Sequence, residues 1–186
     1  MNRLCFGVLA LSLLVGGGCA SEFEIHRSKV GINPLAPAAS ESVYVSLPAD
    51  GTSGSGNTLG PGHFAANAVA AYFSKNGGSA VVGDKPETPD EGLRTAGSRR
   101  FTYCASPKVL HWEDRATEWS GKRDRASLGL IITRVSNGQV IDDAVIEGVG
   151  TWWTLGGLHP QDLLERMMEQ YPIRAAAPPR TDSDVK

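Results

Sequence analysis

The dipeptide Asn137-Gly138 restricts the fold of this chain more than any other local feature. It stands between two runs rich in β-branched and aliphatic residues, 126–135 and Val140–Val149. Asn-Gly favours the positive backbone angles of a two-residue type I′ turn, which joins antiparallel strands. The sequence therefore predicts a β-hairpin in the second half of the chain, with a type I′ turn at its tip.

A strand–helix–strand pattern occurs earlier in the chain. Ser42–Leu47 is rich in β-branched and aromatic residues, apolar residues cluster on one helical face over 63–75, and 79–82 is a short apolar strand. Two strands joined through a helix lie parallel in one sheet, so this pattern predicts a β-α-β unit. A parallel pair and an antiparallel hairpin together predict a mixed β-sheet.

Two more helices and one more strand complete the predicted domain. Residues 88–91, Thr-Pro-Asp-Glu, form a capping box with proline at the first helical position, and an amphipathic helix is predicted over 160–171. The strand predicted over 101–112 contains Pro107, which indicates an edge position or a bulge. We expect a single α/β sandwich-type domain with a mixed sheet, two or three helices and a C-terminal hairpin plus helix.

The N-terminus is predicted to be a signal peptide. Arg3 precedes an apolar run over 4–15, which is too short to cross a hydrocarbon core of about 30 Å as a helix. Three glycines then lead into Cys19, and small residues before a cysteine resemble a bacterial lipoprotein signal. We expect Cys19 to carry lipid, palmitate included. The alternative is cleavage after Ala20, which would give a soluble periplasmic protein.

Four parts follow from these features: a signal peptide (1–18), a lipid-anchored tether (19–40), the α/β domain (41–172) and a disordered tail (173–186). In lipoproteins of enteric-like bacteria, Asp after the cysteine retains the protein at the inner membrane. Ala20 and Ser21 stand there instead, which predicts the outer membrane with the domain facing the periplasm.

The cysteine count and the net charge argue against a disulfide-linked fold and against a nucleic-acid-binding protein. Once the signal is removed and Cys19 is lipidated, only Cys104 keeps a thiol, and its apolar neighbours predict a buried side chain rather than a nucleophile. The net charge of −2 provides no basic field for nucleic acid. We therefore predict no internal disulfide and no nucleic-acid partner.

Residues 110–122 form the most distinctive segment, with one histidine, two tryptophans, three acids and two bases. Exposed tryptophan beside arginine suits sugar rings or a protein partner. The candidate binding surface consists of His111, Trp112, Glu113, Asp114, Arg115, Glu118 and Trp119.

Three other interpretations of this segment stay open. Glu113, Asp114 or Glu118 could serve as the acid and base of a cell-wall or glycan hydrolase. His111 and Glu113, two residues apart, would share one face of a strand and could hold a metal, although no further ligand pattern accompanies them. The segment could also be a structural loop fixed by its tryptophans. We find no catalytic constellation, and we predict no metal site and no cofactor.

The block 110–121 resembles the signature of an uncharacterised proteobacterial lipoprotein family, domain of unknown function 4823. Residues 43–51 and 156–164 provide weaker matches in the same order, so the resemblance spans about 43–171. It implies an envelope lipoprotein with an α/β sandwich, and it brings no established activity and no catalytic residues. We expect a non-enzymatic outer-membrane lipoprotein that binds an envelope protein or glycan, with the hydrolase as the alternative.

Overall fold

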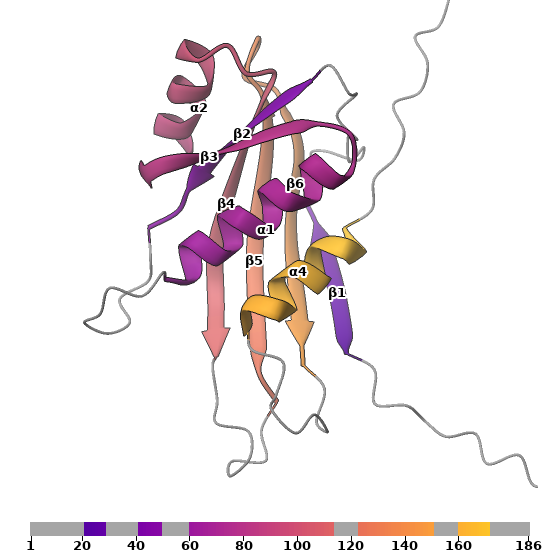
Figure 1. Cartoon of the computed structure of the whole chain (residues 1–186). Helices are drawn as coiled ribbons and strands as arrows, with labels where there is room; N and C mark the ends of the chain where they lie inside the picture. Colours follow the sequence, from indigo (N-terminus) through magenta and orange to yellow (C-terminus); the bar gives the residue numbers. More distant parts are fainter. Residues whose placement is uncertain (1–20, 29–40, 50–59, 114–122, 151–159, 172–186) are drawn as a thin grey trace, which may run out of the picture.

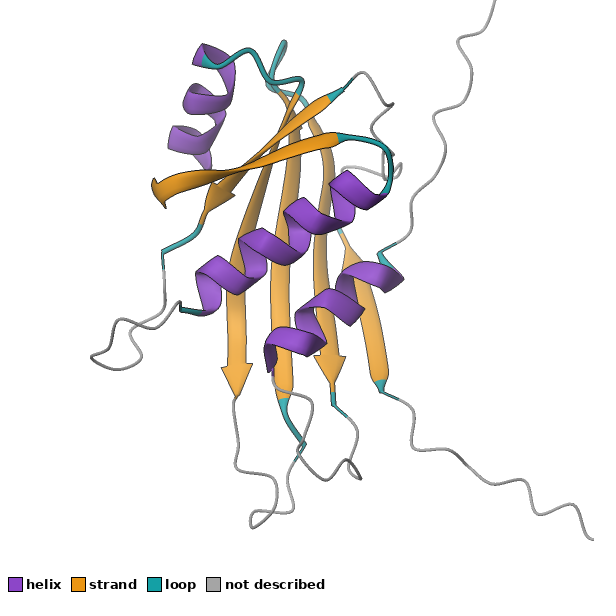
Figure 2. Cartoon of the chain, viewed as in Figure 1, coloured by secondary structure: helices purple, strands orange, loops and turns teal. Residues whose placement is uncertain are grey.

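A six-stranded mixed sheet with the strand order β1-β6-β5-β4-β2-β3 organises the computed structural model of the chain (Figures 1 and 2). The structure describes residues 21–28, 41–49, 60–113, 123–150 and 160–171. The strands are β1 (Glu22–Arg27), β2 (Ser42–Leu47), β3 (Ser79–Pro86), β4 (Tyr103–Glu113), β5 (Arg125–Arg134) and β6 (Val140–Val149). The helices are α1 (Pro61–Lys75), α2 (Pro89–Ser98) and α4 (Pro160–Gln170).

The predicted fold class is confirmed. Strand β2 pairs parallel with β3 and with β4, whereas β4–β5, β5–β6 and β6–β1 are antiparallel. Helix α1 connects the parallel pair β2 and β3, as the strand–helix–strand pattern predicts. The chain thus forms a single α/β domain with a C-terminal hairpin and a helix that packs on the sheet.

The hairpin turn differs from the prediction. Gly138 has a φ of 69°, but Asn137 is not among the described residues with positive φ, so the turn is not type I′. The Asn137 side chain instead accepts a hydrogen bond from the backbone N–H of Gln139 at 3.0 Å. Arg134 N–H donates to the Gln139 carbonyl at 2.8 Å, which makes the loop longer than the two residues of a type I′ hairpin.

The helix boundaries follow the predicted signals closely. Helix α1 begins two residues before the predicted start and ends at Lys75, followed by Gly77 with a φ of 96°. At α2, the Thr88 hydroxyl accepts from Glu91 N–H, and the Glu91 carboxylate accepts from Thr88 N–H at 2.9 Å. These hydrogen bonds stabilise the charged form and lower the pKa of Glu91.

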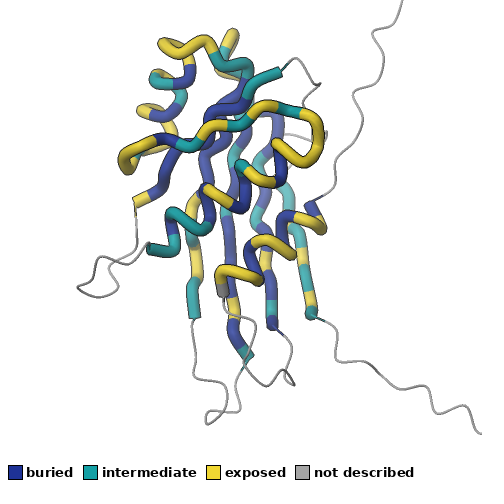
Figure 3. The backbone as a smooth tube through the Cα atoms, in the orientation of Figure 1, coloured by how far each residue is buried: buried dark blue, intermediate teal, exposed yellow. Residues whose placement is uncertain are grey.

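Two helices cover one face of the sheet. Helices α1 and α4 pack against each other over the strands, and Figure 3 shows buried positions beneath them and exposed positions on their outer sides. The main core lies between these layers. Its large, fully buried side chains include Phe73, Leu128, Leu130, Ile146, Leu163 and Met167.

Helix α2 packs on β2 and β4 and belongs to a second, smaller cluster of Tyr44, Ala96 and Cys104. These strand residues alternate with Val43, Val45, Tyr103 and Ala105 of the main core, so α2 lies on the opposite face. Close approach depends on Gly92, where a Cβ would lie 2.6 Å from the Cβ of Ser46.

Strand β4 lies inside the sheet over Tyr103–Ala105, but at Pro107 it has a described neighbour on one side only, so the predicted edge position is confirmed there. Strand β2 pairs only with Tyr103–Ala105 of β4, and at Pro107 only β5 remains as a described neighbour. Proline is tolerated there because one side of β4 is already unpaired. A register shift does occur, but it falls further along, between Val109 and His111.

Strand β1 lies within the segment predicted to be a tether. Its six residues pair in register with β6, from Glu22 opposite Val149 to Arg27 opposite Ala144. A strand in this segment was not expected from the sequence. None of the helices among the described residues is long and apolar enough to cross a membrane.

Candidate functional site

The face of the sheet opposite α1 and α4 carries a row of polar side chains near one end. On β1, Glu24 and His26 are exposed, while Phe23 and Ile25 turn toward the core. The strand register places Glu24 opposite Glu147, Glu147 opposite Ser127, and Ser127 opposite His111. Side chains paired in this way share a face, so this row crosses four strands. We call this surface, together with Leu110 and Glu113, the open face.

His111 and Glu113 share the open face, as their spacing predicts. His111 Nε2 lies 3.3 Å from Glu113 Oε1, and the two side chains are 50% and 25% exposed. The register shift after Val109 leaves Leu110 48% exposed. An accessible apolar side chain therefore lies next to an accessible His–Glu pair.

Trp112 lies on the other face of β4. Its ring stacks on Phe64 of α1, with centroids 6.2 Å apart and an interplanar angle of 9°, and it packs on the main core. It is half-buried, so packing is one of its roles. The other predicted surface residues, Asp114, Arg115, Glu118 and Trp119, lie outside the described residues, as do the hydrolase carboxylates apart from Glu113.

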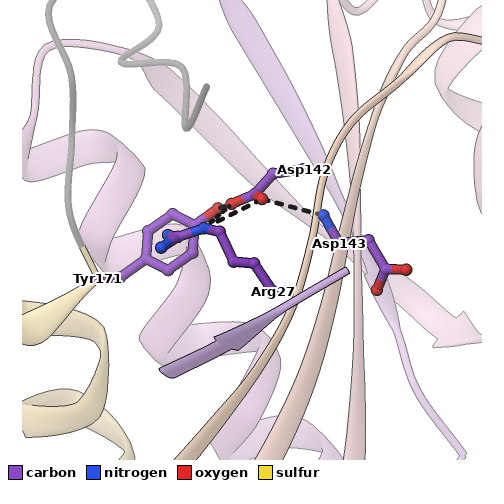
Figure 4. Close-up of polar contacts among 4 residues, drawn as sticks. All are labelled: Arg27, Asp142, Asp143 and Tyr171. Carbon is purple, nitrogen blue, oxygen red and sulfur yellow. Dashed lines mark hydrogen bonds and ion pairs between the residues drawn. The ribbon is translucent and has the colours of Figure 1, made fainter. Parts of the chain in front are cut away.

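A buried polar network joins β1, β6 and the end of α4 (Figure 4). Asp142 is 0% exposed, and both of its carboxylate oxygens lie 3.2 Å from Arg27 Nε. The Tyr171 hydroxyl donates to Asp142, and the Arg27 guanidinium lies 5.2 Å from the centre of the Tyr171 ring. Asp143 N–H donates to the same carboxylate at 3.1 Å.

This network holds elements together and offers no reactive group. Burial and the hydrogen bond to Asp142 raise the pKa of Tyr171, so its hydroxyl stays protonated and keeps donating. The neighbouring Tyr72 also donates to the Tyr171 carbonyl at 2.7 Å, and burial raises its pKa. The arrangement is that of a structural clamp for β1 and α4.

Cys104, a free thiol, is buried as predicted. Burial raises its pKa to about 11, which leaves almost no thiolate near neutral pH. The described part of the chain therefore contains no activated thiol.

The residues 37–174 match the model of the domain of unknown function DUF4823. The chain belongs to the DUF4823 family. The expected resemblance to domain of unknown function 4823 is thus confirmed over most of the chain.

Two solved structures of PelC from Paraburkholderia phytofirmans show the same fold as the DUF4823 domain. The PelC dodecamer is 20% identical, with a TM-score of 0.56 over 82% of this chain and 99% of that chain. A single-substitution variant of the PelC dodecamer is 19% identical, with a TM-score of 0.54 over 79% of this chain and 96% of that chain. No curated protein matches this chain in sequence.

Sequence reasoning missed what β1 contributes to the DUF4823 domain. Strict polar–apolar alternation over Glu22–Arg27 is a strand signal that could have revealed it. Near His26 in the sequence stand Glu22 and Glu24, and only the β1–β6 pairing adds Glu147. Asp142 is one of three carboxylates in β6, and only the fold shows that it is the buried one and that Arg27 is its partner.

Proposed function

We propose that this DUF4823 protein is a non-enzymatic lipoprotein of the bacterial envelope. Lipid on Cys19 anchors it in the outer membrane, with the domain facing the periplasm, and the sheet end that carries residues 111–122 binds an envelope protein or glycan. The observation that carries the proposal is the register at that end, where Glu22, Val149, Arg125 and Glu113 lie on four adjacent strands.

The register brings Glu22 and Glu113 to the same end of the sheet, which supports an anchor and a binding surface that lie close together. Strand β1 begins three residues after Cys19, a length of about 10 Å when extended. Glu113 lies three strands away from Glu22, about 14 Å across the sheet. The partner would therefore be met close to the membrane surface, not deep in the periplasm.

The exposed groups at this end suit recognition. Leu110 supplies apolar contact area, and the His111–Glu113 pair beside it supplies polar contacts. PelC is a dodecamer, so assembly with further copies of this chain belongs to the same proposal. The mass of the detergent-solubilised protein, measured by light scattering, tests that part directly.

The anchor is tested by labelling cells with radioactive palmitate. We expect label on the wild-type chain in the outer-membrane fraction and none on Cys19→Ser, because the thiol of Cys19 is the proposed acceptor. Absence of label on the wild type, or label that survives Cys19→Ser, would contradict the anchor.

The binding surface is tested by placing a photo-crosslinking residue at Leu110 in the lipidated protein. The matched control carries it at Asn67, which is likewise exposed and lies on α1. We expect a discrete adduct at Leu110 and none at Asn67. Turnover of peptidoglycan fragments by the purified protein, abolished by Glu113→Gln, would overturn the non-enzymatic assignment.

A further inference from the structure

Two glutamates and a histidine converge on the open face where β1 meets β6. Glu24 and His26 come from β1, and Glu147 comes from β6. His26 Nε2 lies 3.4 Å from Glu24 Oε1, and one ligand atom from each of the three residues lies within 4.8 Å of the others. All three side chains are exposed, with His26 at 56%.

The charges in this cluster point to a missing cation. Glu24 and Glu147 are direct cross-strand partners, and like charges in that position destabilise a sheet. Of the described arginines near this edge, Arg27 pairs with buried Asp142, Arg123 pairs with Glu22, and Arg125, opposite Val149, forms no salt bridge with either glutamate. No described side chain forms a salt bridge or hydrogen bond with the Glu147 carboxylate. The strand pairing thus holds two carboxylates together with His26 beside them and no described lysine or arginine between them.

The donor set suits a particular class of ion. One imidazole nitrogen and two carboxylate oxygens fit a first-row divalent ion such as Zn²⁺ better than Mg²⁺, which prefers oxygen ligands alone. Bonds of about 2.0–2.2 Å place tetrahedral ligands about 3.3 Å apart. The Glu24–His26 distance already meets this spacing, and rotation of exposed side chains can close the rest.

We propose that Glu24, His26 and Glu147 bind a divalent first-row transition-metal ion, with water in the remaining coordination position. The ion would join β1 to β6 from the open face, whereas Arg27 and Asp142 join the same strands from the helix-covered face. Because the three ligands come together only when β1 is paired, binding stabilises the docked strand. This site does not depend on the proposed function.

The test uses the full-length protein purified in detergent and freed of metal with a chelator. Titration calorimetry with ZnCl₂ should show one saturable site, with a rise in Tm on zinc addition, and MgCl₂ should show none. His26→Ala and Glu147→Gln should each weaken zinc binding by at least about tenfold, because even loss of an outer-shell partner costs about 10–100-fold. The zinc-dependent rise in Tm should disappear with the binding.

The matched control is His111→Ala. His111 is as exposed as His26 and also lies beside a glutamate at 3.3 Å, but the described residues give that pair no third ligand. Zinc affinity should therefore be unchanged. Equal affinity in wild type and His26→Ala, equal binding of MgCl₂, or weakened binding in His111→Ala would each overturn the proposal.

Two further measurements separate a lost ligand from a damaged fold. Metal-free Glu147→Gln should be at least as stable as metal-free wild type, since a like-charge pair has been relieved. X-ray absorption of the zinc-loaded protein should show one imidazole, oxygen ligands and no sulfur. A sulfur ligand would assign the zinc to a cysteine and contradict the site.

Discussion

The same three side-chain types meet at opposite flanks of the sheet. At each flank a tyrosine hydroxyl donates to a carboxylate, and an arginine guanidinium lies over the tyrosine ring at 5.2 or 5.5 Å. The trio of the β1 flank is Tyr171, Asp142 and Arg27, and the trio of the β3 flank is Tyr44, Glu87 and Arg99.

Burial separates the two trios. Asp142 is fully buried and must be neutralised by Arg27, whereas Glu87 is half-exposed and also accepts from the Thr95 hydroxyl at 2.6 Å. Burial strengthens each interaction and raises the penalty for an unpaired charge. We therefore expect the same kind of contact to contribute strongly to stability at the β1 flank and weakly at the β3 flank.

The largest expected effect comes from Asp142→Ala. Removing one partner of a buried ion pair costs about 3–5 kcal/mol, and the lower end applies because Arg27 is 24% exposed. Urea unfolding measures the loss. The control is Asp143→Ala. Because the Asp143 side chain is half-exposed, this substitution should lower the free energy of unfolding by less than about 1 kcal/mol. Equal effects of the two substitutions would contradict the buried clamp.

The second largest effect is expected at alkaline pH, which should destabilise the fold by ionising Cys104 in the small cluster that also contains Tyr44. The folded pKa of Cys104 is about 11 against an ordinary 9, so the free energy of unfolding is unaffected below pH 9 and falls as the pH rises toward 11. The full loss is about 2–3 kcal/mol. Urea unfolding at pH 8 and pH 10 should show this fall in wild type and a smaller one in Cys104→Ala. The same fall in both proteins would rule out the thiol.

Gly92→Ala should weaken the packing of α2 on β2 and β4 by up to about 2 kcal/mol net. The added methyl would meet Ser46 at 2.6 Å, and this overpacking exceeds the gain in helix propensity of about 1 kcal/mol. Hydrogen exchange should show faster exchange in α2 with α4 unchanged. Gly97→Ala provides the control, because its Cβ would meet only Val135 at an ordinary 3.7 Å.

Glu87→Ala should have the smallest effect, about 0.5–1.5 kcal/mol, because water can replace its hydrogen bonds to Tyr44 and Thr95. A double-mutant cycle with Tyr44→Phe measures the contribution of the pair. Should Glu87→Ala destabilise the protein as strongly as Asp142→Ala, burial would not be what distinguishes the trios.

The helices and the β-α-β unit were predictable because their signals are local. The Thr88–Glu91 capping box, the glycine after α1 and the apolar face of α4 each lie within one helix length. Periodicity and caps therefore fixed three helices and the β-α-β unit without reference to the rest of the chain.

The β1 side depends on long-range pairing. Arg27 and Asp142 lie 115 residues apart, and nothing near either residue identifies the other. The same applies to Glu147 beside His26. Of the candidate surface, the shared face of His111 and Glu113 followed from strand geometry, but the packing of Trp112 on Phe64 required the position of α1. These contacts depend on how distant segments pack and pair in the fold, so residue spacing along the chain could not predict them.

The position of β1 has a mechanical consequence for an anchored protein. The strand begins next to Cys19 and runs antiparallel to β6 over six register pairs. A pull from the membrane, directed along β1, would load all of these pairs in shear at once instead of peeling them one by one. The Arg27–Asp142 pair at the far end would resist the same sliding motion. Under such a pull, β1 would then transmit force from the proposed lipid anchor into the domain without first separating from β6.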